Sequence, residues 1–153
     1  MSMRFLPASD NALLVELPDL AHTMALHRVL ADQPIAGVLE VVPAARTLLV
    51  TYQRAALALP DLVAALRARA AVANAQVDVA DAAPGRLVEI PVHYNGEDLP
   101  TVAELLGTTV REVIDRHTGQ PWQAAFAGFA PGFVYLAGGH PSFQLPRRSS
   151  PRT

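Results

Sequence analysis

Two residue types are missing from this chain of 153 residues: it has no cysteine and no lysine, so all twelve of its basic side chains are arginines. Without cysteine, the chain forms no disulfide, carries no thiolate nucleophile and offers no cysteine ligands to zinc. Without lysine, it has neither the lysine of a phosphate-binding loop nor an amine for Schiff-base chemistry. We therefore do not expect this chain to bind a nucleotide by itself.

Long apolar runs and strong charge are also lacking. Proline, arginine or aspartate interrupts each hydrophobic stretch before it reaches membrane-spanning length, and residues 1–5 lack the apolar segment of a signal peptide. The formal net charge of −2 gives no reason to expect nucleic acid or an anionic membrane as a partner. Because 51% of the residues are hydrophobic, the chain can bury a core, and we expect a soluble cytoplasmic protein.

The common catalytic motifs are absent as well. The chain contains no G-x-S-x-G, H-E-x-x-H, G-x-x-x-x-G-K or G-x-G-x-x-G pattern. Its five histidines are scattered and show no metal-ligand spacing, so no metal site is predicted.

The order of patterns in residues 1–80 predicts a small α+β domain. Apolar strand patterns alternate with two helices that open at Pro18 and Pro60, in the order strand, helix, strand, strand, helix, strand. This is the split order of a ferredoxin-like βαββαβ domain. The predicted strands span 12–17, 38–42, 47–52 and 76–79, after a short strand at 4–8. No catalytic spacing occurs here, so we interpret this half as a scaffold or docking module.

Residues 81–85 are small, polar and turn-prone, and we predict that they link the first domain to a second one at 86–153. At its start, residues 86–92 alternate between apolar and polar side chains, which predicts a strand. Two short helices then follow, and the second opens with a capping box formed by Thr109 and Glu112.

Two histidines in this second part are candidates for proton transfer. His117 lies seven residues after Val110 on the second helix, so we expect it to face inward near the helix end. There it can bond a terminal carbonyl or point into a neighbouring pocket. His93 stands beside Tyr94 in a polar segment after the predicted strand, where sites often lie, although a solvated loop explains it equally well.

Residues 125–139 are the most unusual stretch, because they hold four aromatic residues, four glycines and one proline. One interpretation is a strand, a turn and a second strand packed as core, which the residue pattern alone favours. The other is the apolar wall of a ligand site, where the glycines allow close approach to the backbone.

The last residues are rich in arginine, with Arg147, Arg148 and Arg152 among serines and prolines. The planar fork of an arginine side chain suits carboxylate and phosphate recognition. A basic, serine- and proline-rich end is equally typical of a frayed tail, which composition alone favours.

The segment Gly128-Phe-Ala-Pro-Gly-Phe-Val-Tyr-Leu136, followed by Pro146-Arg147-Arg148 and Pro151-Arg152-Thr153, resembles the signature of the KipI / allophanate hydrolase subunit 1 family, which includes the B-type subunits of 5-oxoprolinases. Blocks at 5–16, 37–43, 47–50 and 90–94 and the helix that ends at His117 resemble the family pattern in the same order. The resemblance covers the whole chain. Family members continue with a β-rich segment that completes a cyclophilin-like barrel, so we expect residues 86–153 to form an incomplete cyclophilin-like β domain with two short helices.

The resemblance implies a subunit of an ATP-dependent 5-oxoprolinase, which converts 5-oxo-L-proline, ATP and water to L-glutamate with A-type and C-type partner subunits. ATP, with Mg²⁺, would be used by the complex and not bound by this chain alone, and we expect no activity from the chain alone. Two alternatives stay open: a KipI-like inhibitor of a sensor histidine kinase, and a carboxyltransferase module of urea metabolism.

The resemblance also suggests roles for individual residues. In this interpretation Phe129, Phe133 and Tyr135 hold the substrate ring, and the backbone of Pro131-Gly132 approaches it. A carboxylate or phosphate is expected to bind the arginines named above, Arg147, Arg148 or Arg152. Proton transfer or orientation is expected from His93 and His117.

Overall fold

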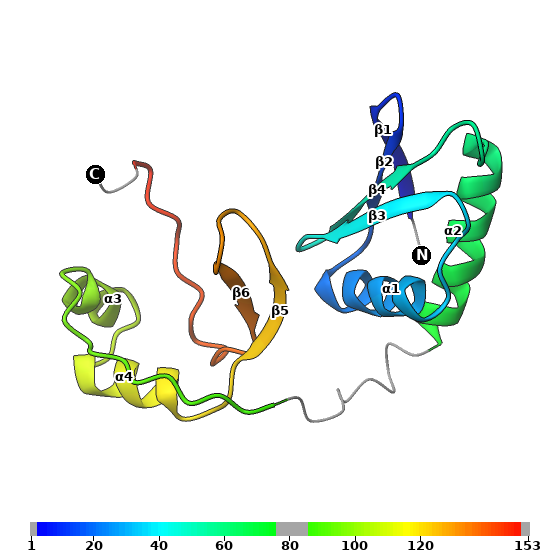
Figure 1. Cartoon of the computed structure of the whole chain (residues 1–153). Helices are drawn as coiled ribbons and strands as arrows, with labels where there is room; N and C mark the ends of the chain where they lie inside the picture. Colours follow the sequence, from blue (N-terminus) through cyan, green and yellow to red (C-terminus); the bar gives the residue numbers. More distant parts are fainter. Residues whose placement is uncertain (1–2, 76–85, 151–153) are drawn as a thin grey trace. The chain divides into compact units, whose positions relative to one another are not determined.

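The computed structural model describes residues 3–75 and 86–150, and the chain divides into two compact units, Met1–Arg86 and Leu87–Thr153 (Figure 1). Most of the buried hydrophobic side chains among the described residues belong to the first unit. Together the units make a mixed α/β chain whose strands pair in antiparallel fashion within the described residues.

The first unit is built on a four-stranded antiparallel sheet with the strand order β1-β2-β4-β3. Leu13 and Val15 alternate with half-buried neighbours along their strand, and Leu48, Val50 and Tyr52 do the same along theirs, as expected for strands that bury one face. The four strands are β1 (Arg4–Ser9), β2 (Ala12–Glu16), β3 (Val38–Pro43) and β4 (Thr47–Tyr52).

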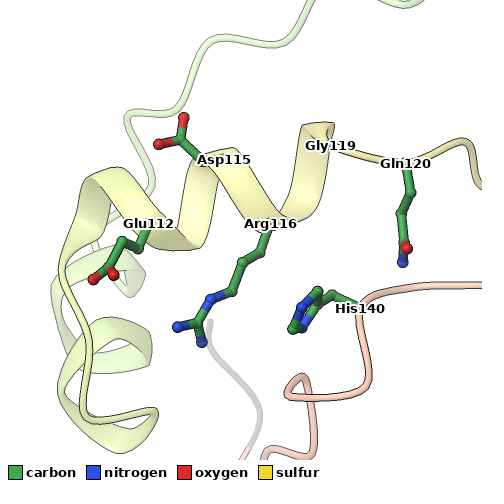
Figure 2. Close-up of a pocket in the computed structure, with 6 residues that line it drawn as sticks. All are labelled: Glu112, Asp115, Arg116, Gly119, Gln120 and His140. Atoms are coloured by element: carbon green, nitrogen blue, oxygen red, sulfur yellow. The ribbon is translucent and has the colours of Figure 1, made fainter.

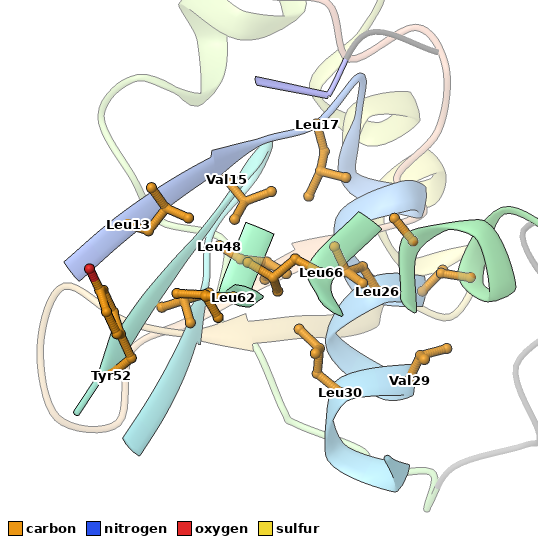
Figure 3. Close-up of a cluster of buried hydrophobic side chains, with 14 residues drawn as sticks. Leu13, Val15, Leu17, Leu26, Val29, Leu30, Leu48, Tyr52, Leu62 and Leu66 are labelled. Atoms are coloured by element: carbon orange, nitrogen blue, oxygen red, sulfur yellow. The ribbon is translucent and has the colours of Figure 1, made fainter. Parts of the chain in front are cut away.

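Two helices, α1 (Leu20–Asp32) and α2 (Leu59–Asn74), supply the rest of the core of this unit. The Asp19 side chain caps α1 by accepting the backbone N–H of His22 at 3.0 Å, and a proline lies in the first turn of α2. Figure 3 shows side chains from both helices meeting those of β2 and β4 in one cluster. The largest fully buried members are Leu26, Leu48, Leu62 and Leu66.

The ferredoxin-like description of this unit is not established. Both helices and four of the five predicted strands are present, and β4 lies between β2 and β3 as the split order requires. However, the predicted strand at 76–79 lies outside the described residues. The ferredoxin-like order would place that strand at the edge of β2 that faces away from β4, and this edge is paired with β1 instead.

The second unit contains two short helices, α3 (Leu99–Leu105) and α4 (Val110–Thr118), and a two-stranded antiparallel sheet of β5 (Gln123–Ala127) and β6 (Val134–Ala137). The predicted capping box of α4 is confirmed, because Thr109 and Glu112 bond each other's backbone N–H groups. Hydrogen bonds from the Thr108 hydroxyl, and then from Thr109, lower the pKa of Glu112 to about 2.

The strand predicted at 86–92 is wrong. Residues 86–96 form neither helix nor strand and pair with no strand of the described chain, and Leu87 and Ile90 are each 75% exposed. An alternating pattern stabilises a strand only when a neighbour accepts its backbone hydrogen bonds and covers one face. Because the described residues of the second unit form a single two-stranded sheet, the cyclophilin-like barrel also stays a prediction.

No helix in the described part of the chain is long and apolar enough to cross a membrane.

Candidate functional site

The glycine- and aromatic-rich stretch forms a hairpin, in which residues 128–133 connect β5 to β6. The Gly128 N–H donates to the Phe133 carbonyl at 3.1 Å, and the Phe133 N–H donates to the Ala130 carbonyl at 3.0 Å. Gly132 has φ +77°, which suits a residue without a side chain, and nothing would contact a Cβ at this position. The hairpin therefore has a compact tip with an open backbone at Pro131-Gly132.

Four aromatic rings form a continuous row on this hairpin. Phe126 and Tyr135 are stacked with centroids 4.6 Å apart, Tyr135 meets Phe133 at 5.2 Å, and Phe133 meets Phe129 at 5.5 Å. The outer rings remain accessible: Phe129 is 90% exposed, Phe133 45% and Tyr135 42%. The predicted strand, turn and second strand are therefore confirmed, but their packing as core is wrong for the described chain, and the rings present an apolar surface.

Phe129 adopts a left-handed backbone conformation, with φ 70°. It is the one such non-glycine residue among those that the structure describes. For a bulky side chain this region is strained, at a cost of roughly 1–2 kcal/mol. The strain is not offset by burial of its ring, because the ring is almost fully exposed. Strained residues of this kind concentrate at functional sites.

Replacing Phe129 with glycine is therefore expected to raise the free energy of unfolding of the second unit by about 1 kcal/mol, because glycine adopts positive φ without strain. Denaturant unfolding followed by circular dichroism would measure the change. The matched control is Ala130→Gly at the next position, where φ is not positive and the added chain entropy should be destabilising. Destabilisation by both changes would show that the backbone at Phe129 is not strained.

A second group of rings surrounds His117 near the end of α4. Its Nδ1 lies 2.6 Å from the Tyr94 hydroxyl, and its ring centroid lies 5.0 Å from Trp122 and 6.2 Å from Phe143. The Trp122 indole N–H donates to the His117 carbonyl at 2.8 Å, so the tryptophan satisfies that helix-end carbonyl. His117 is half-buried among these rings, as the helical spacing predicted, and its Nε2 is the nitrogen not bonded to Tyr94.

The other predicted site residues are not gathered around these rings. His93 is exposed in the irregular segment before α3, and no ring contact or hydrogen bond joins it to His117 within the described residues. Arg148 forms an exposed ion pair with Asp98 at 2.8 Å, which holds the chain after the hairpin beside the start of α3. Arg147 is exposed, and Arg152 lies outside the described residues.

A cavity of about 310 Å³ beneath α4 was not predicted from the sequence. Figure 2 shows the side chains of Arg116, Gln120 and His140 on one side of the helix and that of Asp115 on the other. The lining residues are Glu112, Asp115, Arg116, Gly119, Gln120 and His140. The sequence signal that could have pointed to this cavity is Arg116 in the last turn of α4 together with His140, which comes directly after Gly138-Gly139.

Neither site has the ligand set of a metal centre. Within residues 3–75 and 86–150, no three His, Asp or Glu side chains gather as metal ligands would. The groups that the second unit does offer are exposed aromatic surface, imidazoles and guanidinium groups, which suit a small organic ligand with anionic groups.

Comparison with known proteins agrees with the family resemblance. The chain is 47% identical over 70 residues to the B-type subunit of 5-oxoprolinase from Bacillus subtilis, covering 44% of this chain and 29% of that protein. It is 42% identical over 72 residues to the corresponding 5-oxoprolinase subunit from Haemophilus influenzae, covering 45% and 34%. The crystal structure of TTHA0988 in space group P6522 matches with a TM-score of 0.66 and 31% identity, over 93% of this chain and 27% of that one.

The matched segments span about a third or less of these relatives, so the chain corresponds to a part of proteins that are considerably longer. The family model described as "Carboxyltransferase domain, subdomain C and D" matches residues 3–153, which is nearly the whole chain. The chain therefore belongs to the family of carboxyltransferase domains, subdomains C and D.

Proposed function

We propose that this chain is part of a subunit of an ATP-dependent 5-oxoprolinase, which acts with A-like and C-like partner subunits to convert 5-oxo-L-proline to L-glutamate. The observation that carries the proposal is the 47% and 42% identity to two proteins named as B-type subunits of 5-oxoprolinase. The exposed aromatic row supports it, because an apolar surface beside open backbone suits a small ring.

The substrate of this reaction is a five-membered lactam, whose amide bond is stabilised by resonance. Hydrolysis of such a bond is favoured by prior activation, and ATP supplies that activation to the complex. The part of this chain is to hold and orient the ring. Phe129, Phe133 and Tyr135 contact its apolar face, and the unobstructed backbone at Pro131-Gly132 lets the lactam amide come close.

The polar contacts are assigned to the histidines and arginines. The bond between Tyr94 and Nδ1 fixes the His117 ring and leaves Nε2 to take or give a proton. His93 is exposed in the segment before α3 and is accessible for the same purpose. Arg147 contacts a phosphate group in the complex, and so does Arg148, whose bond from Nη1 to Asp98 leaves further N–H donors on the guanidinium. Arg152 is assigned to the same task.

The test is to combine the whole protein that carries this chain with its A-like and C-like partners and to measure glutamate release that depends on both ATP and 5-oxoproline. Replacing Phe133 with leucine keeps the position apolar but removes the ring, and it is expected to lower kcat/KM about tenfold. The control is Leu39→Ala, which alters an exposed side chain of the first unit. Absence of glutamate release above the ATP-free background would overturn the proposed function.

A further inference from the structure

Two side chains at the cavity beneath α4, those of Arg116 and His140, are held in position by Ser142. The Ser142 backbone N–H donates to Nδ1 of His140 at 3.2 Å, so Nδ1 is the unprotonated nitrogen, and the Ser142 hydroxyl lies 2.7 Å from the same atom. The hydroxyl oxygen also accepts a hydrogen bond from Nη1 of Arg116 at 3.3 Å. Ser142 therefore holds the imidazole and the guanidinium side by side.

Both groups keep donors for another molecule. A guanidinium has five N–H donors, and Ser142 takes one of those of Arg116. With Nδ1 acting as acceptor, the remaining proton of the neutral His140 ring is on Nε2. Figure 2 shows the two side chains converging on the same space under the helix. Two N–H groups that converge in this way match the two oxygens of a carboxylate.

The acidic side chains that line the cavity are engaged elsewhere. Glu112 accepts hydrogen bonds from the hydroxyl of Thr108 and from the hydroxyl and backbone N–H of Thr109. Asp115 also borders the cavity, but its carboxylate bonds Arg111 at 3.2 Å. Glu112 attracts the Arg116 guanidinium electrostatically, and its Oε2 serves the helix cap. The groups open to a ligand are thus mainly donors.

Gln120 contributes one acceptor beside these donors. Its amide NH₂ donates to the Gly138 carbonyl at 2.6 Å, which leaves the side-chain oxygen for an N–H group. We propose that Arg116 and His140 bind the carboxylate of a small ligand in this cavity while Gln120 accepts its N–H. Among small carboxylates, 5-oxoproline and glutamate fit this description, and that choice rests on the proposed function. A ligand in this cavity is a molecule separate from the one assigned to the aromatic row, because no ring of that row lines the cavity.

Binding is to be measured by titration calorimetry on the whole protein that carries this chain. The probes are the sodium salts of 5-oxoproline, glutamate and acetate, together with 5-oxoprolinamide, which lacks the carboxylate, and inorganic phosphate. Arg116→Gln is expected to weaken binding of 5-oxoproline roughly tenfold to a hundredfold, as loss of a charge-assisted hydrogen bond does. It should leave the binding of 5-oxoprolinamide, already weak, unchanged.

The matched control is Arg111→Gln on the same helix, which removes the same charge from an exposed side chain paired with Asp115. A second variant, His140→Asn, keeps an acceptor for the Ser142 N–H but removes the Nε2 donor, and it should also weaken binding of 5-oxoproline. Circular dichroism would confirm that each variant is folded. If Arg116→Gln does not fold, His140→Asn decides the matter by the same titration.

The outcomes separate this inference from the proposed function. Loss of carboxylate binding in Arg116→Gln without any glutamate release by the assembled wild-type complex would support the site and overturn the function. A second outcome is that the complex releases glutamate while wild type, Arg116→Gln and His140→Asn bind 5-oxoproline with affinities within about twofold of each other. This outcome would support the function and overturn the site. Phosphate binding stronger than that of every carboxylate, and lost in both variants, would overturn the assignment to carboxylates.

Discussion

Replacing Leu26 with alanine is expected to lower the free energy of unfolding of the first unit by about 3–4 kcal/mol. Leu26 is fully buried on α1, in the cluster that also contains Leu48 of β4 and Leu66 of α2 (Figure 3). The change removes apolar contact area and leaves a cavity between the helices and the sheet, which neighbours fill only in part. Denaturant unfolding followed by far-ultraviolet circular dichroism would measure the loss.

The control for this change is Leu39→Ala on β3, which makes the same chemical substitution at a side chain that is 65% exposed. An exposed leucine leaves no cavity when it is shortened, so its effect should stay within about 0.5 kcal/mol. Similar losses at the two positions would contradict the arrangement of the core between α1, α2 and the sheet.

Replacing Gly139 with alanine is expected to lower the free energy of unfolding of the second unit by about 2 kcal/mol and to loosen the rings around His117. A Cβ at this position would lie 2.5 Å from Cζ3 of Trp122 and closer still to Cη2. The indole cannot turn aside freely, because its N–H is bonded to the His117 carbonyl and its ring lies against the imidazole. Trp122 is the sole tryptophan of the chain, so its fluorescence reports the displacement directly.

Gly96→Ala is the matched control, because nothing lies within 4 Å of a Cβ added there and its φ is not positive. We expect this variant to retain the fluorescence and the unfolding midpoint of the wild type. An unchanged tryptophan spectrum in Gly139→Ala would mean that Trp122 does not pack on Gly139.

The helices and strands with local signals could be predicted from the sequence. The capping box at Thr109 and Glu112 determines where α4 begins, and its two partners lie within one turn of each other. Leu13 and Val15 on β2, like Leu48 and Val50 on β4, stand at every second position, and this alternation with their neighbours identifies the buried face of each strand. Helical spacing also identifies the inward face of α2, where Leu62 and Leu66, four positions apart, are both buried.

Local patterns failed where a partner element decides the outcome. On α1 helical spacing alone favours an inward stripe that includes His27, whereas in the structure Leu26 and Val29 are buried and His27 is half-exposed. Several faces of this helix are apolar enough to be buried, and contact with α2 and the sheet selects one of them. The same reason explains residues 86–92, whose alternating pattern finds no partner strand in the described chain.

The candidate site separates most clearly the features that the sequence determined from those that only the tertiary structure decided. The sequence by itself identified the aromatic and glycine-rich stretch and the helix that carries His117, because these residue types are uncommon in such a short span. Only the tertiary structure decided that the rings of Phe129 and Phe133 face outward and that Arg116 meets His140, which follows it by 24 positions along the chain. Periodicity reports which face of one element is apolar, whereas the meeting of two side chains depends on how separate elements pack, which no local pattern encodes.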